Sequence, residues 1–240
     1  MEIPLYYCEQ LNDEAMIHMG LTLLDEQLSR YPAGFFTQLR IEQDKPFHFQ
    51  LVGFIQHVFS GTVATGVCTE MDGIHLIGLS VREEFQTRDW GEPFLSTGDP
   101  FLEYALHHEI GHGVDYIIQR LTTGTPFDPE KWDQLLPPEF RYDDYIRGET
   151  DAPQDYVPNR AFVFRQGGEA EAFFCDIYAK SSLEEHIASL FGYAMCAHPA
   201  EALKSPWIQE QIQYYFPLIR NTFQREGWPE TTYWERTLVR

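Results

Sequence analysis

The stretch His108-Glu109-Ile110-Gly111-His112 decides how this chain of 240 residues is interpreted. It matches the pattern H-E-x-x-H, in which two histidines lie four positions apart. On an α-helix, residues at this spacing lie one turn apart on the same face, so both imidazoles can bind one metal ion. Glu109 lies about 100° round the helix from His108 and can act as a general base on a water molecule beside the metal. We therefore predict that His108 and His112 are metal ligands and that Glu109 is catalytic.

The sequence around the motif independently predicts a helix. Asp99 is suited to an N-cap and Pro100 to the first helical position. From there the helix is expected to run to about Arg120 and to stop within 122–126. Its expected core face consists of apolar residues three or four positions apart, namely Leu102, Leu106, Ile110, Val114 and Ile117. The alternative to a metal site is a pair of buried histidines whose ring nitrogens are satisfied by hydrogen bonds.

Four other residues of this helix, one inside the motif and three beside it, have expected roles of their own. Gly111 and Gly113 would weaken a helix made only for packing, by up to ~1 kcal/mol each relative to Ala, which indicates that a strand or a substrate comes close. Asp115 lies one turn beyond His112 and is expected to accept a hydrogen bond from an imidazole N–H or to cap the helix. His107 is one residue out of register, so we interpret it as a packing or surface residue.

A third metal ligand must come from elsewhere in the chain, because catalytic zinc sites hold three protein ligands and leave one position for water. A histidine six residues after His112 would extend the motif, but position 118 is isoleucine. A downstream glutamate is then the natural candidate. Glu185 is favoured, and Glu169 and Glu171 stay as alternatives.

The preference for Glu185 rests on a helix expected at 181–195. Ser181 and Glu184 have the spacing of a capping box at its start. On this helix Glu185 shares a face with three small residues, Ala188, Ser189 and Gly192. The helix could therefore lie close against the metal-bearing helix and present one carboxylate from its first turn.

The remaining patterns predict a single α+β domain over 1–240. A helix begins at Asp13 and ends near 31–34, and strands are expected at 47–55, 61–69 and 73–79, the last two joined by a turn at 70–73. A long excursion at 126–159 contains one short helix at about 130–136, and a further helix covers about 206–223. The expected parts are an N-terminal helix and sheet (about 1–98), a metal-binding helical part (about 99–225) and a tail (226–240), whose aromatic residues between Trp228 and Trp234 are expected to cover the core.

Composition excludes several classes of function. The formal net charge of −20 would repel nucleic acid and anionic membranes. It favours basic peptide substrates or serves only solubility. The four cysteines, Cys8, Cys68, Cys175 and Cys196, contain no C-x-x-C pair, which argues against a zinc ribbon or a dithiol redox site. With no signal peptide or membrane-spanning segment in the pattern, we expect a cytoplasmic protein and leave secretion by a signal-less route open; the oligomeric state is unknown.

Three segments together resemble a known family. They are 108–115, 173–179 and 185–188, and they are similar to the gluzincin metallopeptidases of the anthrax lethal factor and Pro-Pro endopeptidase type, a group that also contains uncharacterised bacterial zinc peptidases. In that family a tyrosine lies seven residues before the glutamate ligand, and Tyr178 and Glu185 have that spacing. The specific likeness covers only about 101–195.

The resemblance implies a zincin-like metallopeptidase domain, with a small sheet, an HExxH active-site helix and a mostly helical C-terminal half. It implies one Zn²⁺ held by His108, His112 and Glu185, with Tyr178 donating its phenol to the developing oxyanion. It also implies that an upstream strand, here 74–79, pairs with extended substrate. Two features depart from the family: Ser189 stands where an acidic residue usually supports a ligand histidine, and the long gap before Glu185 indicates an inserted segment at about 126–165.

The function that follows is a zinc-dependent endopeptidase that acts on a peptide or protein substrate. Glu109 would take a proton from water and later pass it to the leaving amine. Two alternatives stay open from the sequence. One is a catalytically silent zinc-binding structural or interaction protein on the same scaffold, and the other is an effector protease directed at a host protein.

Overall fold

After a first short strand, the elements of secondary structure follow the expected order, with a helix before the other strands and mostly helices in the second half of the chain. The computed structural model describes residues 6–42, 45–59, 63–71, 74–81, 101–121, 127–137, 140, 142, 173–176, 178–196 and 201–238. The strands are β1 (Tyr6–Glu9), β2 (Arg40–Glu42), β3 (Lys45–Pro46), β4 (His48–Val52), β5 (Phe54–His57), β6 (Val63–Ala64), β7 (Gly66–Met71) and β8 (Ile74–Ser80). The helices are α1 (Glu14–Leu28), α2 (Phe35–Gln38), α4 (Phe101–Tyr116), α5 (Pro129–Gln134), α7 (Leu183–Met195) and α8 (Pro206–Thr222). Shorter helical turns are η1 (Ile117–Leu121), η4 (Tyr178–Lys180), η5 (Glu201–Lys204) and η6 (Trp234–Thr237).

The expected strand at 47–55 is two strands in two sheets. Gly53 separates β4 from β5, and its backbone N–H donates to Glu9 O at 2.9 Å. Beyond it β5 pairs with β1 and β6, whereas β4 pairs with β8. The strand β1 was not predicted. The prediction of one strand was wrong because an uninterrupted apolar run does not reveal where the chain changes its pairing partner.

The mixed sheet β4-β8-β7 carries the helix α4. Strand β8 runs parallel to β4 and antiparallel to β7, so both of its edges are paired, and β7 lies at the edge of this sheet. Leu51 and Gly66 are both register partners of Leu79 and therefore face the same side. On this side the side chain of Leu51 packs against Gly20 of α1, and Gly66 lies against the side chain of Glu109 on α4. Helices α1 and α4 thus share one face of the sheet.

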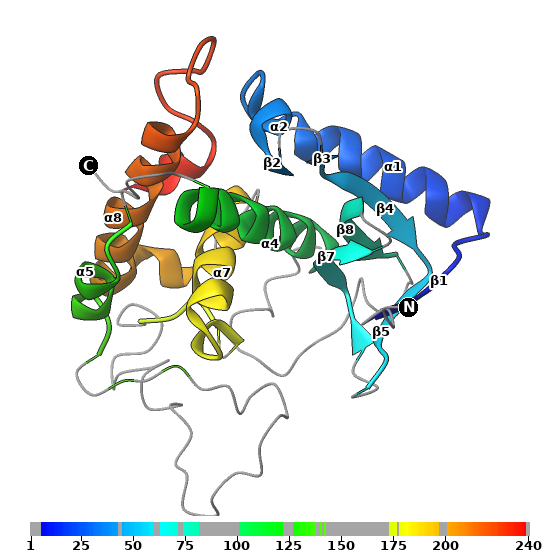
Figure 1. Cartoon of the computed structure of the whole chain (residues 1–240), viewed down its shortest axis with the longest axis horizontal. Helices are drawn as coiled ribbons and strands as arrows, with labels where there is room; N and C mark the ends of the chain where they lie inside the picture. The colour runs from blue at the N-terminus through cyan, green and yellow to red at the C-terminus, as the bar shows by residue number, and fades with distance from the viewer. Residues whose placement is uncertain are drawn as a thin grey trace, which may run out of the picture.

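Helix α4 lies at the centre of the main core. In Figure 1 it runs across the middle of the molecule, from the strands towards α7 and α8. Every residue of its predicted core face is at most 8% exposed, which confirms that part of the prediction: Leu102, Leu106, Ile110, Val114 and Ile117. Its other faces are largely buried too, because α4 packs against the sheet on one side and against α7 on the other.

The close approach of α7 to α4 depends on residues with little or no side chain. A Cβ on Gly111 would lie 3.0 Å from Ala188 Cα, and one on Gly192 would lie 3.2 Å from the backbone N of His108. The small residues expected on α7 therefore do face the metal-bearing helix. At Gly111 the element that comes close is this helix rather than a strand or a substrate.

The start of α7 differs by one residue from the sequence prediction. The N-cap is Ser182, whose hydroxyl accepts a hydrogen bond from the backbone N of Glu185 at 3.2 Å. Ser181 instead donates its hydroxyl to Tyr178 O at 2.8 Å. The predicted capping box of Ser181 and Glu184 is therefore wrong, because the preceding turn η4 uses the first serine.

The aromatic tail covers the core, as predicted. The indole of Trp234 is fully buried, and its ring centroid lies 5.8 Å from that of Phe35 and 5.7 Å from that of Phe191. The short helix α5 and the helix α8 also match their predictions, with Asp128 as the N-cap of α5. The segments 82–100 and 143–172, and with them Asp99 and most of the expected insertion, lie outside the described residues.

Candidate metal centre

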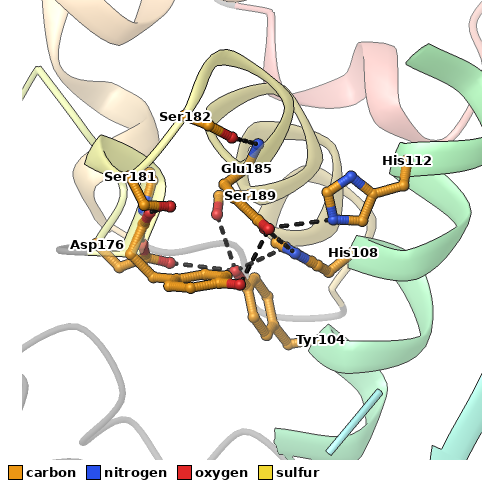
Figure 2. A network of polar contacts seen from close by, with 10 residues as sticks. Tyr104, His108, His112, Asp176, Ser181, Ser182, Glu185 and Ser189 are labelled. Atoms are coloured by element: carbon orange, nitrogen blue, oxygen red, sulfur yellow. Dashed lines mark hydrogen bonds and ion pairs between the residues drawn. The ribbon is translucent and has the colours of Figure 1, made fainter. Parts of the chain in front are cut away.

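Two helices bring three candidate ligands to one point. His108 and His112 project from α4, and Glu185 projects from the first turn of α7 (Figure 2). Oε2 of Glu185 lies 3.0 Å from His108 Nε2 and 3.3 Å from His112 Nε2. The two imidazole rings are nearly perpendicular, with centroids 4.8 Å apart. The rings are therefore turned towards the same carboxylate oxygen.

The donor set fits a single metal ion. One ligand atom from each of His108, His112 and Glu185 lies within 4.8 Å of the others. Two imidazoles and one carboxylate are a set that catalytic zinc sites use. Among the described residues no fourth His, Cys, Asp or Glu joins the group. The alternative ligands Glu169 and Glu171 lie outside the described residues.

Glu185 and His112 each shift the pKa of the other. Burial disfavours ionised Glu185, but hydrogen bonds from His108 and His112 outweigh this and keep its pKa well below the ordinary value. Burial likewise disfavours a charged His112, yet its hydrogen bond to Glu185 and the nearby carboxylates raise its pKa to about 9. The ionised carboxylate of Glu185 therefore faces a protonated His112, and a metal ion must displace the proton of that imidazole in order to bind.

The affinity of this group for a divalent metal ion is consequently expected to increase with pH. Because the pKa of His112 is about 9, its ring carries a proton at pH 7, and only the deprotonated nitrogen binds metal. Binding should release about one proton from this ring, and affinity should rise about tenfold per pH unit from about pH 6 to about pH 8. Calorimetry in buffers of different ionisation enthalpy counts the released protons. A pH-independent affinity over this range would contradict the protonated state of His112.

Glu109 lies beside the candidate ligands, between α4 and the edge strand β7. Its side chain is buried, and burial raises its pKa although His108 and His112 act in the opposite direction. A Cβ on Gly66 would lie 2.7 Å from Glu109 Cγ and 2.8 Å from Oε1. Glycine at this position therefore makes room for the carboxylate. A buried carboxylate with a raised pKa is suited to taking up a proton and releasing it again.

Tyr178 reaches the centre from the turn η4. Its hydroxyl donates a hydrogen bond to Oε1 of Glu185 at 2.9 Å, while Oε2 of the same carboxylate faces the histidines. The side chain is 45% exposed, in contrast to the buried residues around it. The predicted tyrosine thus lies at the open side of the site, where its phenol can also meet a bound molecule.

A second group of polar residues supports His108 from behind, and the sequence analysis did not identify its key members. The hydroxyl of Tyr104 lies 3.1 Å from His108 Nδ1, 3.1 Å from Asp176 Oδ2 and 3.1 Å from Ser189 Oγ (Figure 2). Tyr104 precedes His108 by four residues, so the helical spacing used to pair the histidines could have identified it. No comparable signal connects Asp176 to the motif, since it is 72 positions from Tyr104.

Two other neighbours of the motif, His107 and Asp115, have hydrogen-bond partners outside the group of candidate ligands. The ring of His107 is fully buried, with Tyr31 OH at 2.8 Å from Nδ1 and Gln27 Oε1 at 3.2 Å from Nε2, which confirms the interpretation as a packing residue. The carboxylate of Asp115 accepts hydrogen bonds from Gln119 Nε2 and Tyr215 OH, both at 2.8 Å. Asp115 therefore acts on His112 through its charge, which contributes to the raised pKa of that imidazole.

Comparisons with known proteins identify no relative of this chain, so the interpretation of the site depends on its geometry. No protein-family model matches the chain, and neither the curated proteins nor the solved structures provide a match. In the part of the chain that the structure describes, none of the helices combines the length and the apolar character that a membrane span requires. The chain is an α+β protein in which His108, His112 and Glu185 form a buried group that could hold one metal ion.

Proposed function

We propose that this chain is a zinc-dependent endopeptidase. The observation that carries the proposal is the convergence of His108 Nε2, His112 Nε2 and a carboxylate oxygen of Glu185, with Glu109 on the same helix. A structural zinc site is normally closed by four protein ligands, whereas three of the residues that the structure describes converge here. A purely structural site would also need neither a buried carboxylate at position 109 nor a hydroxyl at position 178.

The residues of the site have distinct parts in the proposed reaction. His108, His112 and Glu185 would hold the ion, which supplies a Lewis acid that polarises the scissile carbonyl and makes water more acidic. Glu109 accepts the proton of the attacking water and passes it to the leaving amine, as a buried carboxylate with a raised pKa can do. Tyr178 donates its hydroxyl to the oxygen on which negative charge develops.

Strand β7 offers the position for an extended substrate. The strand first expected to bind it, 74–79, is β8, and both edges of β8 are already paired with β4 and β7. That expectation was wrong because a strand in the middle of a sheet has no free backbone groups to offer. Gly66 on β7 lies against Glu109, so a peptide added along the edge of β7 would bring its backbone to the general base.

Removing the hydroxyl of Tyr178 tests its part in the reaction. The Tyr178→Phe variant is expected to lower kcat by about 100- to 1,000-fold, as the loss of one oxyanion donor does. KM should change little, and the kinetics are measured in excess zinc because the variant also loses the hydrogen bond from this hydroxyl to the ligand Glu185. Steady-state kinetics on a cleaved peptide measures both constants. A change in KM alone would assign Tyr178 to substrate binding.

Metal analysis combined with a degenerate peptide library tests the proposed function as a whole. The purified protein is expected to contain about one zinc ion per chain and to cleave at least one class of peptide. Removing the ion with a chelator should stop cleavage, and adding zinc should restore it. Metal retained through purification together with no cleavage of any peptide would favour a structural zinc protein instead.

A further inference from the structure

The hydroxyl of Tyr104 connects three polar groups behind the candidate metal ligands. His108 Nδ1, Asp176 Oδ2 and Ser189 Oγ each lie 3.1 Å from this oxygen. All four side chains are buried, with Tyr104 9%, His108 5%, Asp176 6% and Ser189 0% exposed. Buried polar groups must find hydrogen-bond partners within the protein, so the directions of these bonds can be worked out from the available protons.

The direction of the bond to Asp176 fixes the others. An ionised carboxylate only accepts hydrogen bonds, and its other oxygen, Oδ1, already accepts from the backbone N of Ala179 at 2.7 Å. Tyr104 therefore donates its single proton to Asp176 Oδ2. The two lone pairs of the Tyr104 oxygen are left to accept protons, one from Ser189 Oγ and one from His108 Nδ1.

A proton on Nδ1 leaves Nε2 of a neutral His108 with a lone pair. That nitrogen lies 3.0 Å from Oε2 of Glu185, which also carries lone pairs. Without a metal ion, a second ring proton on Nε2 makes the hydrogen bond to Glu185 described above, and a metal ion takes the place of that proton when it binds. The bonds behind the ring thus prepare its front for a metal ion.

We propose that Tyr104 and Asp176 are positioning residues that hold the proton of His108 on Nδ1 and so keep Nε2 ready to bind the metal. This inference rests on the metal site of the proposed function. It adds that Tyr104 selects one tautomer of the ligand His108, and that Asp176 acts on His108 by orienting the hydroxyl of Tyr104. Partners behind a ligand histidine generally contribute to metal affinity in this way.

Two variants disturb the relay, meaning the hydrogen bonds that run from Asp176 through Tyr104 to His108, in different ways. Tyr104→Phe removes the acceptor that the described residues provide for Nδ1–H, so the ring proton should move to Nε2, where Glu185 accepts it. In Asp176→Asn the backbone N–H of Ala179 keeps the amide oxygen at the Oδ1 position, which turns the NH₂ group towards Tyr104. Because Tyr104 could then donate to Ser189 Oγ instead, this substitution is combined with Ser189→Ala, so that Tyr104 accepts from the amide and donates to His108 Nδ1, which moves the ring proton to Nε2. This second variant keeps the size of the side chain at position 176 and serves if Tyr104→Phe does not fold.

Tyr31→Phe is the matched control. Tyr31 is also buried, and its hydroxyl lies 2.8 Å from Nδ1 of His107, the residue next to His108 on the same helix. Both phenylalanine variants therefore remove one tyrosine–histidine hydrogen bond from α4. Only the bond at His108 involves a candidate metal ligand.

Two measurements decide the inference. The first is ¹⁵N NMR of metal-free protein labelled at histidine, with the His108 signals assigned from a His108→Gln spectrum. Nδ1 of His108 should carry a proton in the parent and in Tyr31→Phe, and should lack it in Tyr104→Phe and in Asp176→Asn combined with Ser189→Ala. The second is zinc affinity by competition with a chelator, which should fall about 10- to 100-fold in the latter two variants and stay unchanged in Tyr31→Phe.

The inference is overturned if Nδ1 of His108 carries no proton in the parent, or if the two phenylalanine variants lose zinc affinity equally. Its failure can be told apart from failure of the proposed function. A protein that binds zinc but cleaves no peptide contradicts the endopeptidase assignment, while both measurements still apply. If no metal binds, the position of the ring proton alone decides, with a proton on Nδ1 supporting the relay and a proton on Nε2 alone overturning it.

Discussion

Replacing Glu109 with glutamine is expected to lower kcat for peptide hydrolysis by about 100- to 10,000-fold, the contribution of a positioned general base. The amide has the shape of the carboxylate but cannot accept a proton. Glu109 is not one of the three converging ligands, so zinc content should stay at the level of the parent. The buried position against Gly66 should still hold the isosteric side chain.

Kinetics and metal analysis of the same Glu109→Gln preparation check this result. Loss of activity with zinc retained is the expected combination. Glu184→Gln is a suitable control, because it makes the same chemical change at an exposed residue on α7. Cleavage by Glu109→Gln at the rate of the parent would show that another group takes the proton.

Removing the carboxylate of Glu185 is expected to have the largest effect on metal binding. The Glu185→Ala variant loses the oxygen that faces both histidines at 3.0 and 3.3 Å. Its zinc affinity should fall by more than about 100-fold, which exceeds the effect of losing a residue behind a ligand. Because Glu184 is adjacent but exposed, Glu184→Ala should bind zinc as the parent does.

The free energy of unfolding, measured with and without zinc, reports how much metal affinity the Glu185→Ala variant has lost. Free zinc at about 1,000 times Kd should raise the free energy of unfolding of the parent by about 4 kcal/mol, since the ion binds only the folded chain. The Glu184→Ala control should gain as much. Glu185→Ala should gain far less at the same concentration of zinc. An equal gain in all three proteins would mean that another residue completes the site.

The local features of the site followed from the sequence because they depend on residues close together in the chain. The spacing of His108 and His112 places both rings on one helical face, whatever surrounds the helix. The small residues on α7 similarly indicated that a neighbouring helix comes close, and Gly111 and Gly192 lie in that contact. The same reasoning could have included Tyr104, which is one turn before His108.

The features that sequence reasoning missed depend on pairing between distant segments. The place of strand β8 between β4 and β7 is set by two pairings. The alternation of residues along a strand shows which side is buried and does not show which strands flank it. The family resemblance implied that 74–79, which is β8, binds the substrate, whereas in the part of the sheet that the structure describes β7 is the outer strand beside Glu109.

By itself, the sequence determined that one helix would present two histidines and a glutamate at fixed angles, since helical geometry allows no other arrangement of these positions. Only the tertiary structure decided which distant groups meet them. Glu185 approaches His108 from 77 positions away, and Asp176 reaches Tyr104 from 72. Such contacts arise when buried surfaces pack and buried polar groups find partners, which are properties of the whole folded chain rather than of any local stretch.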